Sequence, residues 1–318
     1  MIEGIPRISV RIITYKQEVL IKRAINSLLA QKDYIYEICV SDDCSPDNTW
    51  EVLRDYDRQY PGLFKLNRNE QNLGIFENTE KSWTMPTGDL VYGLAGDDEC
   101  GDDWFKKVVE FIQINGIDYK NELFCVYGDY KCVYPNGDSF VFKNDEIQKG
   151  IDPLRLSIRG IIGNRSACFS RKVLQKYKRV SQGRSYIPES AQDRQLQLFS
   201  EMNYYIPDIG NIYYTQIGVN VSFNLKRFEE REYVEEYARK FIVANGYTFL
   251  ENDLYFFKYK TEKAKSYRDK SIKHKLLIFW LFLKSYDTQF GLKQIRPKRY
   301  LFALVRRLPH KKPISWVI

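Results

Sequence analysis

The sequence predicts an α/β protein built on a doubly wound, mostly parallel sheet, followed by a helical C-terminal extension. Short apolar runs rich in β-branched residues alternate four times with amphipathic helical patterns in roughly the first 100 residues. The connections between these runs are short, which is typical of a parallel sheet covered by helices. The chain has 318 residues, of which 44% are hydrophobic, so it is long enough to bury a large core.

Each element of this fold is expected from its own local pattern. The predicted strands span residues 8–13, 37–41, 64–66 and 90–95, and the predicted helices between them span about 20–29, 47–60 and 76–85. Asp102 and Asp103 are expected to cap a helix that runs to about Ile114. Asn136-Gly137 lies between apolar runs at 124–134 and 139–142, which predicts a hairpin.

Polar and acidic side chains follow three of the predicted strands. The candidates are Thr14, Asp42, Asp43, Asp97, Asp98 and Glu99. Ligands of doubly wound sheets bind beyond the carboxyl ends of the strands, so these side chains are expected at one sheet edge. Three consecutive carboxylates repel one another, and hard cations such as Mg²⁺ or Mn²⁺ prefer oxygen ligands of this kind. The alternative for the acidic triplet is a solvated turn.

Four segments in register carry a resemblance to a known family. They are TYK at 14–16, SDDCSPDNT at 41–49, NLGIFEN at 72–78 and TGDLVYGLAGDDE at 87–99. Together they resemble the family 2 inverting glycosyltransferases with a GT-A fold, over roughly residues 6–215. The resemblance implies a Rossmann-like GT-A domain, a Mn²⁺ or Mg²⁺ cofactor and a nucleotide-sugar donor, with a UDP-sugar favoured.

The resemblance also implies roles for individual residues. The donor would be bound by Thr14, Tyr15, Glu18, Asp42, Asp43, Asn72, Gly74 and Asp97. Within this set, Asp43 would hydrogen-bond the base and Asp97 would contact the ribose. Asp98, with Glu99 beside it, would hold the metal on the diphosphate.

Two positions depart from the family pattern. Glu77 stands where many relatives have Arg, and the segment 214–218 (YTQIG) lacks the usual Arg or His on the phosphate side. Candidates for the missing cation are Arg194, Lys226 and Arg227.

The resemblance places the catalytic base and the acceptor side in the next part of the chain. Asp193, at the start of a predicted helix, would take the proton of the acceptor hydroxyl, and Glu189 is the reserve candidate. A helix cap is the structural alternative for Asp193. The segment 160–170 (GIIGNRSACFS) resembles an acceptor-side loop, with Asn164, Arg165 and Ser166 as contacts.

The C-terminal part differs from the rest in charge. We expect a catalytic domain over 1–225 and a basic helical extension over 226–318. Between Lys258 and Lys312 there are 17 Lys and Arg against three acidic residues, a balance of +14, while the remainder of the chain carries −6. The apolar run at 276–283 (LLIFWLFL) is far shorter than the ~20 residues that span a bilayer. Its basic and aromatic flanks favour a helix lying on an anionic membrane surface, and a buried core helix is the alternative. No nucleic-acid motif accompanies the charge, so no nucleic-acid partner is expected.

These features predict a glycosyltransferase that moves a hexosyl or N-acetylhexosaminyl group to a saccharide or lipid-linked saccharide acceptor in surface polysaccharide biosynthesis. A sugar nucleotidyltransferase is an alternative, but the segment 8–16 lacks the Gly-rich basic loop it needs. A catalytically inactive glycan- or membrane-binding module is a second alternative.

Six Cys without CxxC spacing and two His do not predict a zinc site, and Cys39 and Cys168 are expected as reduced core residues. No apolar N-terminal signal is present, so we expect a cytoplasmic protein that is peripheral on the inner face of the cell membrane.

Overall fold

The computed structural model describes residues 5–150, part of the segment 152–163, residues 165–176, 196–197, 199–214 and 246, and the segments 251–265 and 271–285. In the first part of the chain, strands and helices alternate as predicted. The elements are β1 (Ile8–Thr14), α1 (Leu20–Leu29), a 3-10 turn η1 (Lys32–Tyr34), β2 (Ile35–Asp42), α2 (Thr49–Gln59), β3 (Phe64–Arg68), α3 (Ile75–Trp83) and β4 (Leu90–Ala95). The four strands and three helices expected here are confirmed, and their ends agree within two residues.

The second part adds short strands, one long strand and further helices. In order these are β5 (Glu99–Cys100), α4 (Trp104–Ile114), β6 (Phe124–Val133), β7 (Ser139–Phe142), a 3-10 turn η2 (Asp145–Lys149), β8 (Cys168–Ser170), α6 (Arg171–Lys176), β9 (Met202–Tyr214), α9 (Glu251–Lys265) and α10 (Ile272–Lys284). β6 and β7 pair antiparallel, which confirms the hairpin. Gly137 has the positive φ of +87° that its turn requires.

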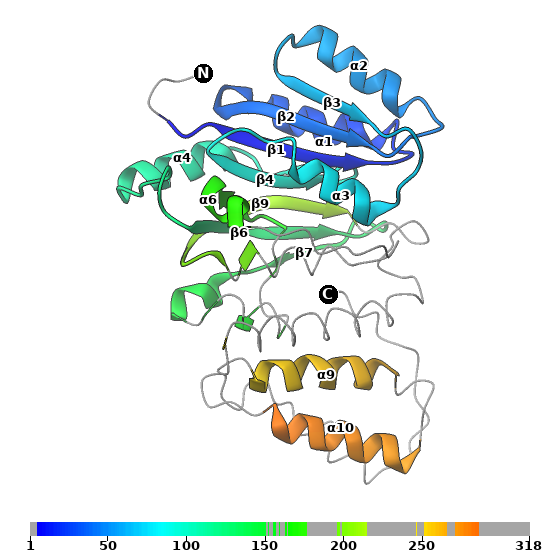
Figure 1. The fold of residues 1–318 in the computed structure, drawn as a ribbon, viewed down its shortest axis with the longest axis vertical. Coiled ribbons are helices and arrows are strands. Elements are labelled where there is room, and N and C mark those ends of the chain that lie inside the picture. The colour runs from blue at the N-terminus through cyan, green and yellow to red at the C-terminus, as the bar shows by residue number, and fades with distance from the viewer. Residues whose placement is uncertain are drawn as a thin grey trace.

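The described strands form one nine-stranded sheet. Their order is β3-β2-β1-β4-β8-β6-β9-β5, and β7 pairs with the side of β6. β3, β2, β1 and β4 run parallel, whereas β8 joins β4 antiparallel. In Figure 1 the sheet extends from β3 near one end of the molecule to β6 and β7 near its middle. The predicted α/β class with a mostly parallel sheet is confirmed.

The register of the central strands brings their carboxyl ends together. Thr14 at the end of β1 pairs with Asp42 at the end of β2, and Ile13 pairs with Ala95 at the end of β4. The loops that follow these three strands therefore leave the sheet at the same edge. The predicted convergence of the polar strand ends is a direct consequence of this register.

The core is built from the apolar faces that the sequence pattern marks. Every residue of β1 is buried, because helices cover both faces of the parallel part of the sheet. The buried face of α1 consists of Ile21, Ala24, Ile25 and Leu28. All six cysteines are free, and Cys39 and Cys168 are fully buried, as expected.

Trp104 fixes how α4 packs on the sheet. Its ring occupies the space where side chains at Gly128 of β6 and Gly210 of β9 would lie. A Cβ at Gly128 would be 2.5 Å from Cη2 of Trp104, and a Cβ at Gly210 would be 2.8 Å from its Cε2. These two glycines let α4 approach the middle of both strands closely.

The expected cap of α4 by Asp102 and Asp103 is wrong. Asp103 has a left-handed conformation with φ of +53°, and its side chain accepts no hydrogen bond from the helix. The backbone carbonyl of Gly101 accepts from the N–H of Trp104 instead, at 3.3 Å. The turn at Gly101 therefore satisfies a donor that a side chain would otherwise have to meet.

The helices α9 and α10 form an antiparallel pair at the end of the molecule opposite α2 and β3 (Figure 1). They pack through a small cluster of Tyr259, Ile278 and Leu281. Among the described residues, no helix is both long and apolar enough to cross a membrane. The boundary expected at 225/226 lies outside the described residues, so the division into two domains stays a prediction.

Candidate active site

Thr14 lies at the edge of the sheet where β1 and β4 end. Its side chain is 3% exposed, and its Oγ1 donates to Oε1 of Gln17 at 2.8 Å. Gly96, just after β4, packs so closely against Gln17 and Thr14 that a Cβ there would collide with Oε1 of Gln17. The β1 and β4 loops are therefore locked against each other at this edge.

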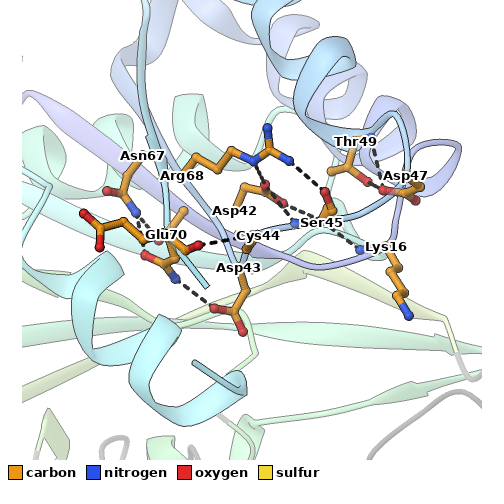
Figure 2. Close-up of polar contacts among 12 residues, drawn as sticks. Lys16, Asp42, Asp43, Cys44, Ser45, Asp47, Thr49, Asn67, Arg68 and Glu70 are labelled. Carbon is orange, nitrogen blue, oxygen red and sulfur yellow. Dashed lines mark hydrogen bonds and ion pairs between the residues drawn. The ribbon is translucent and has the colours of Figure 1, made fainter. Parts of the chain in front are cut away.

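Asp42 fixes the loop that follows β2. Its carboxylate accepts from the backbone N–H of Ser45 at 3.2 Å and from the Ser45 hydroxyl, and it lies 3.6 Å from Nε of Arg68. The side chain is fully buried, and desolvation raises its pKa above the ordinary value in spite of these contacts. Figure 2 shows the carboxylate pointing toward Ser45 and Arg68.

Asp43 points away from that pair and fixes the loop before α3 (Figure 2). Its Oδ1 accepts from Nδ2 of Asn69 and from N–H of Leu73, and its Oδ2 accepts from N–H of Gly74, each at 2.8 Å. Gly74 has φ of +84°, which favours glycine at this turn. The structure thus joins three of the predicted donor-binding residues, Asp43, Asn72 and Gly74, through one loop, and leaves the side chain of Asn72 exposed.

Tyr15 and Glu18 lie in the loop between β1 and α1. The ring of Tyr15 is 38% exposed. Glu18 accepts from the backbone N–H of Asn48 at 3.0 Å, and the N–H of Lys16 donates to Oγ of Ser45 at 3.0 Å. These bonds tie the first loop to the β2 loop, while the side chain of Lys16 points away from the polar network (Figure 2).

The acidic triplet after β4 is paired with two arginines. Glu99 lies 3.1 Å from Nε of Arg23 and accepts from the hydroxyl of Tyr214 at 2.9 Å. Asp98 is 2% exposed, accepts from the backbone N–H of Tyr214 at 3.2 Å, and lies 3.5 Å from Nη1 of Arg165. Asp97 is partly buried, and desolvation raises its pKa. The triplet is therefore a structured cluster in contact with cations, not a solvated turn.

The two guanidinium groups are held by consecutive rings at the end of β9. Arg23 stacks on Tyr214 and Arg165 on Tyr213, each with its guanidinium carbon 3.5 Å from the ring centroid. Successive side chains point to opposite sides of a strand, so the arginines approach the triplet from two sides. Both side chains remain about one third exposed.

Comparison with known proteins shows what this arrangement is similar to. Residues 9–122 match the model described as Glycosyl transferase family 2. Over these residues, about a third of the chain, the sequence is similar to that family. Its matched segment contains β1 to α4, and thus the three polar loops and the acidic triplet.

Individual relatives agree with this assignment. An uncharacterised glycosyltransferase of Mycoplasma genitalium is 34% identical over 100 residues, which is 31% of this chain and 34% of that protein. Glycosyltransferase AglE of Haloferax volcanii is 27% identical over 147 residues, 46% of each chain. The chain spans between a third and a half of the length of these curated relatives.

The fold is also similar to that of a solved structure. The crystal structure of S. aureus TarS 1-349 is similar with a TM-score of 0.56 at 15% identity, covering 88% of this chain and 78% of that one. The same protein in complex with UDP-GlcNAc gives a TM-score of 0.55. The predicted GT-A, Rossmann-like fold is confirmed.

The carboxylates at this sheet edge fit a hard cation whose remaining ligands are oxygens of the substrate. Among the described residues, no group of three or more His, Cys, Asp or Glu is placed to hold a metal by itself. Mg²⁺ sites commonly use one or two carboxylates together with substrate phosphates. Asp98 and Asp97 match that pattern, whereas the carboxylate of Glu99 is already held by Arg23 and Tyr214. The roles of Asp98 and Glu99 as metal ligands stay predictions.

The predicted acceptor contacts differ in their surroundings. Ser166 is fully buried, and its hydroxyl bonds to the backbone N–H of Gly128 at 3.1 Å and to the carbonyl of the same residue. Arg165 lies beside the acidic triplet. The acceptor role of both stays a prediction, but the hydroxyl of Ser166 is used within the fold.

Several predicted residues lie outside the part of the chain that the structure describes. They are Asp193, Glu189, Asn164, Arg194, Lys226 and Arg227. Sequence reasoning did not select Arg23. Its position on the exposed side of α1 gives no local signal, because its partners Asp97 and Glu99 lie more than 70 residues further along the chain.

Proposed function

We propose that the protein is an inverting, metal-dependent glycosyltransferase that moves one sugar from a nucleotide-diphosphate donor to a saccharide or lipid-linked saccharide acceptor. The observation that carries this proposal is the convergence of three polar loops and a partly buried acidic triplet at one sheet edge, within the residues that match the family 2 model. The complex of TarS with UDP-GlcNAc supports a UDP-sugar as the donor class to test first. A hexosyl or N-acetylhexosaminyl group and a role in surface polysaccharide assembly are part of the same proposal.

In this mechanism the loop 69–74, held by Asp43, and the exposed ring of Tyr15 bind the nucleoside. Asp97 would contact the ribose, and Asp98 would hold Mn²⁺ or Mg²⁺. When bound, the cation supplies Lewis-acid stabilisation of the leaving diphosphate. Arg23 and Arg165 add positive charge beside it.

The proton of the acceptor hydroxyl has to leave as the oxygen attacks the anomeric carbon. Asp193 is the base we assign to this step, and one carboxylate suffices because an inverting transfer needs no enzyme nucleophile. Asp193→Asn keeps the shape of the side chain and removes its basicity. We expect kcat to fall by ~10²–10⁴, which is roughly 3–5 kcal/mol of barrier, with donor affinity nearly unchanged. Near-parent kcat in Asp193→Asn together with collapse in Glu189→Gln would move the base to Glu189, and a product of retained anomeric configuration would exclude the single displacement.

Donor and metal are tested first without an acceptor. Thermal-shift measurements against UDP-, GDP-, dTDP- and CMP-sugars, with Mn²⁺ or with EDTA, should show stabilisation by one class that depends on the metal. Asp98→Ala should abolish transfer and make the remaining donor binding insensitive to EDTA. Asp102→Ala, an exposed carboxylate a few residues away, is the matched control and should behave as the parent. Full transfer activity of the parent in EDTA would contradict the metal-dependent mechanism.

If the parent binds a nucleotide sugar with metal but transfers it to no acceptor tested, the non-catalytic binding module is favoured. If it forms a nucleotide sugar from a sugar phosphate and a nucleoside triphosphate, the nucleotidyltransferase is favoured.

A further inference from the structure

The surface of α10 that faces away from α9 is apolar and exposed. His274, Ile278 and Leu281 are buried against α9. The side chains on the opposite surface are 47–75% exposed, and we call them the outer face of α10: Ile272, Leu276, Phe279, Trp280 and Leu283. At 100° per residue these five positions fall within an arc of about 100°, centred opposite the buried positions. α10 thus has two apolar faces. α9 covers one of them and contacts the edge of the other, where the ring of Tyr255 lies edge-on to Trp280 with the ring centroids 5.7 Å apart.

Lysines border the outer face on both sides. On the same helical projection Lys273 and Lys284 follow one edge of the arc and Lys275 precedes the other, and all three are exposed. The helix from Ile272 to Lys284 contains no Asp or Glu. An apolar strip with ammonium groups along both edges complements an anionic lipid surface, since lysine stems can lie along the apolar region while their charges reach the headgroups.

The aromatic content and the length of α10 agree with that surface. Trp280 is half exposed, and its ring has the amphipathic character that favours a membrane–water interface. Thirteen residues give a helix of about 20 Å, shorter than the ~30 Å hydrocarbon core of a bilayer. Such a helix lies in the interface plane and does not cross it.

The helix pair is joined firmly to the rest of the protein. Asp253 of α9 is fully buried, and its carboxylate contacts Nε of Arg155 at 2.6 Å and Nε of Arg159. Arg159 also donates to the backbone carbonyl of Ser285, directly after α10, at 3.1 Å. The helix pair is therefore tied to Arg155 and Arg159 by two ion pairs and a hydrogen bond.

We propose that the outer face of α10 docks the protein on an anionic membrane surface. A protein partner or a second copy of the chain would also cover an apolar face. Lysine is depleted at protein–protein interfaces. An apolar face bordered by lysines on both sides, with no acidic residues to pair them, is therefore rare in such interfaces. If the proposed glycosyl transfer is correct, docking would place the protein on the surface that carries a lipid-linked saccharide acceptor.

The experiment measures binding of the full chain to vesicles of phosphatidylcholine containing phosphatidylglycerol and to vesicles of phosphatidylcholine alone. The parent should cosediment with the anionic vesicles at low salt and dissociate as salt is added. Leu276→Ser combined with Phe279→Ser should weaken this binding at least tenfold. Replacing the three lysines by Gln should weaken it about a hundredfold, given roughly 1 kcal/mol for each basic residue near such a surface. Ile114→Ser, which removes an 83% exposed apolar side chain from the end of α4, is the matched control and should bind as the parent.

All variants change only exposed side chains, so their melting temperatures and metal-dependent donor stabilisation should match the parent. Retained donor binding with lost vesicle binding separates this proposal from that of the catalytic function. The proposal is overturned if the parent fails to bind anionic vesicles at low salt, or if Ile114→Ser loses as much binding as the double variant. A parent dimer that the double variant dissociates, without vesicle binding, would assign the face to a second copy.

Discussion

Asp43→Asn tests whether the carboxylate after β2 positions the loop that we assign to the nucleoside. Asparagine keeps one acceptor oxygen and places an amide donor where the other oxygen was. Either Gly74, or Asn69 together with Leu73, then faces a donor instead of an acceptor. At least one hydrogen bond to a charged group is lost, which corresponds to ~1.5–3 kcal/mol of the free energy of unfolding. With about 2–4 °C per kcal/mol for domains of this general size, the melting temperature should fall by roughly 3–12 °C.

The same variant should affect the donor more than the metal. Release of the loop 69–74 should raise the donor Kd about ten- to a hundredfold, measured by calorimetry with Mn²⁺ present, whereas the dependence of binding on Mn²⁺ should persist. Asp55→Asn on α2 is the control, because Asp55 forms only an exposed ion pair with Arg58 and should change stability by less than about 1 kcal/mol. An unchanged melting temperature would refute the positioning role. A lowered melting temperature with an unchanged donor Kd would show that the loop is not part of the donor site.

Two further variants probe charge. Arg165→Gln removes a cation next to Asp98. The variant should bind the donor about tenfold more weakly in calorimetry, and its donor affinity should depend less on ionic strength. Equal donor affinity at low and high salt in both parent and variant would contradict this role. Glu37 tests acid stability: burial acts to raise its pKa, but hydrogen bonds led by the one from Lys65 outweigh burial and lower the pKa from 4.5. Its stabilising contribution is therefore present above pH 4.5 and is lost as pH falls through the lowered pKa, so the difference in unfolding free energy between parent and Glu37→Gln should shrink from about pH 5 to about pH 3 in denaturant titrations. A difference that grows on acidification would mean that the pKa is raised in the folded state.

The parts of the fold that sequence reasoning predicted are those with a local pattern. The period of apolar residues marks α1 and the early strands, and a parallel sheet brings their carboxyl ends together whatever its precise register. The convergence of Thr14, Asp42 and Asp97 could therefore be expected before the structure was known.

The later strands β8 and β9 were missed for a physical reason. β9 contains Pro207 and Gly210, residues that ordinarily argue against a continuous strand. The structure accommodates them because the pairing between β6 and β9 shifts register near Asp129, where more residues of β9 than of β6 are used. Nothing local marks the three-residue strand β8 between β4 and β6, since only its neighbours define it.

The charges around the triplet depend wholly on long-range placement. Asp97, Asp98 and Glu99 contribute three negative charges, and Arg23 and Arg165 contribute two positive ones, so these five described side chains sum to −1. A nucleotide diphosphate that binds alone would add its negative charge to this partly buried cluster, where repulsion is stronger than in water. Entry together with a divalent cation roughly cancels that addition. This charge balance is a reason to expect donor and metal to bind as one unit. A single sequence could not place Arg23 or Arg165 beside the triplet, so the balance could not be predicted from it.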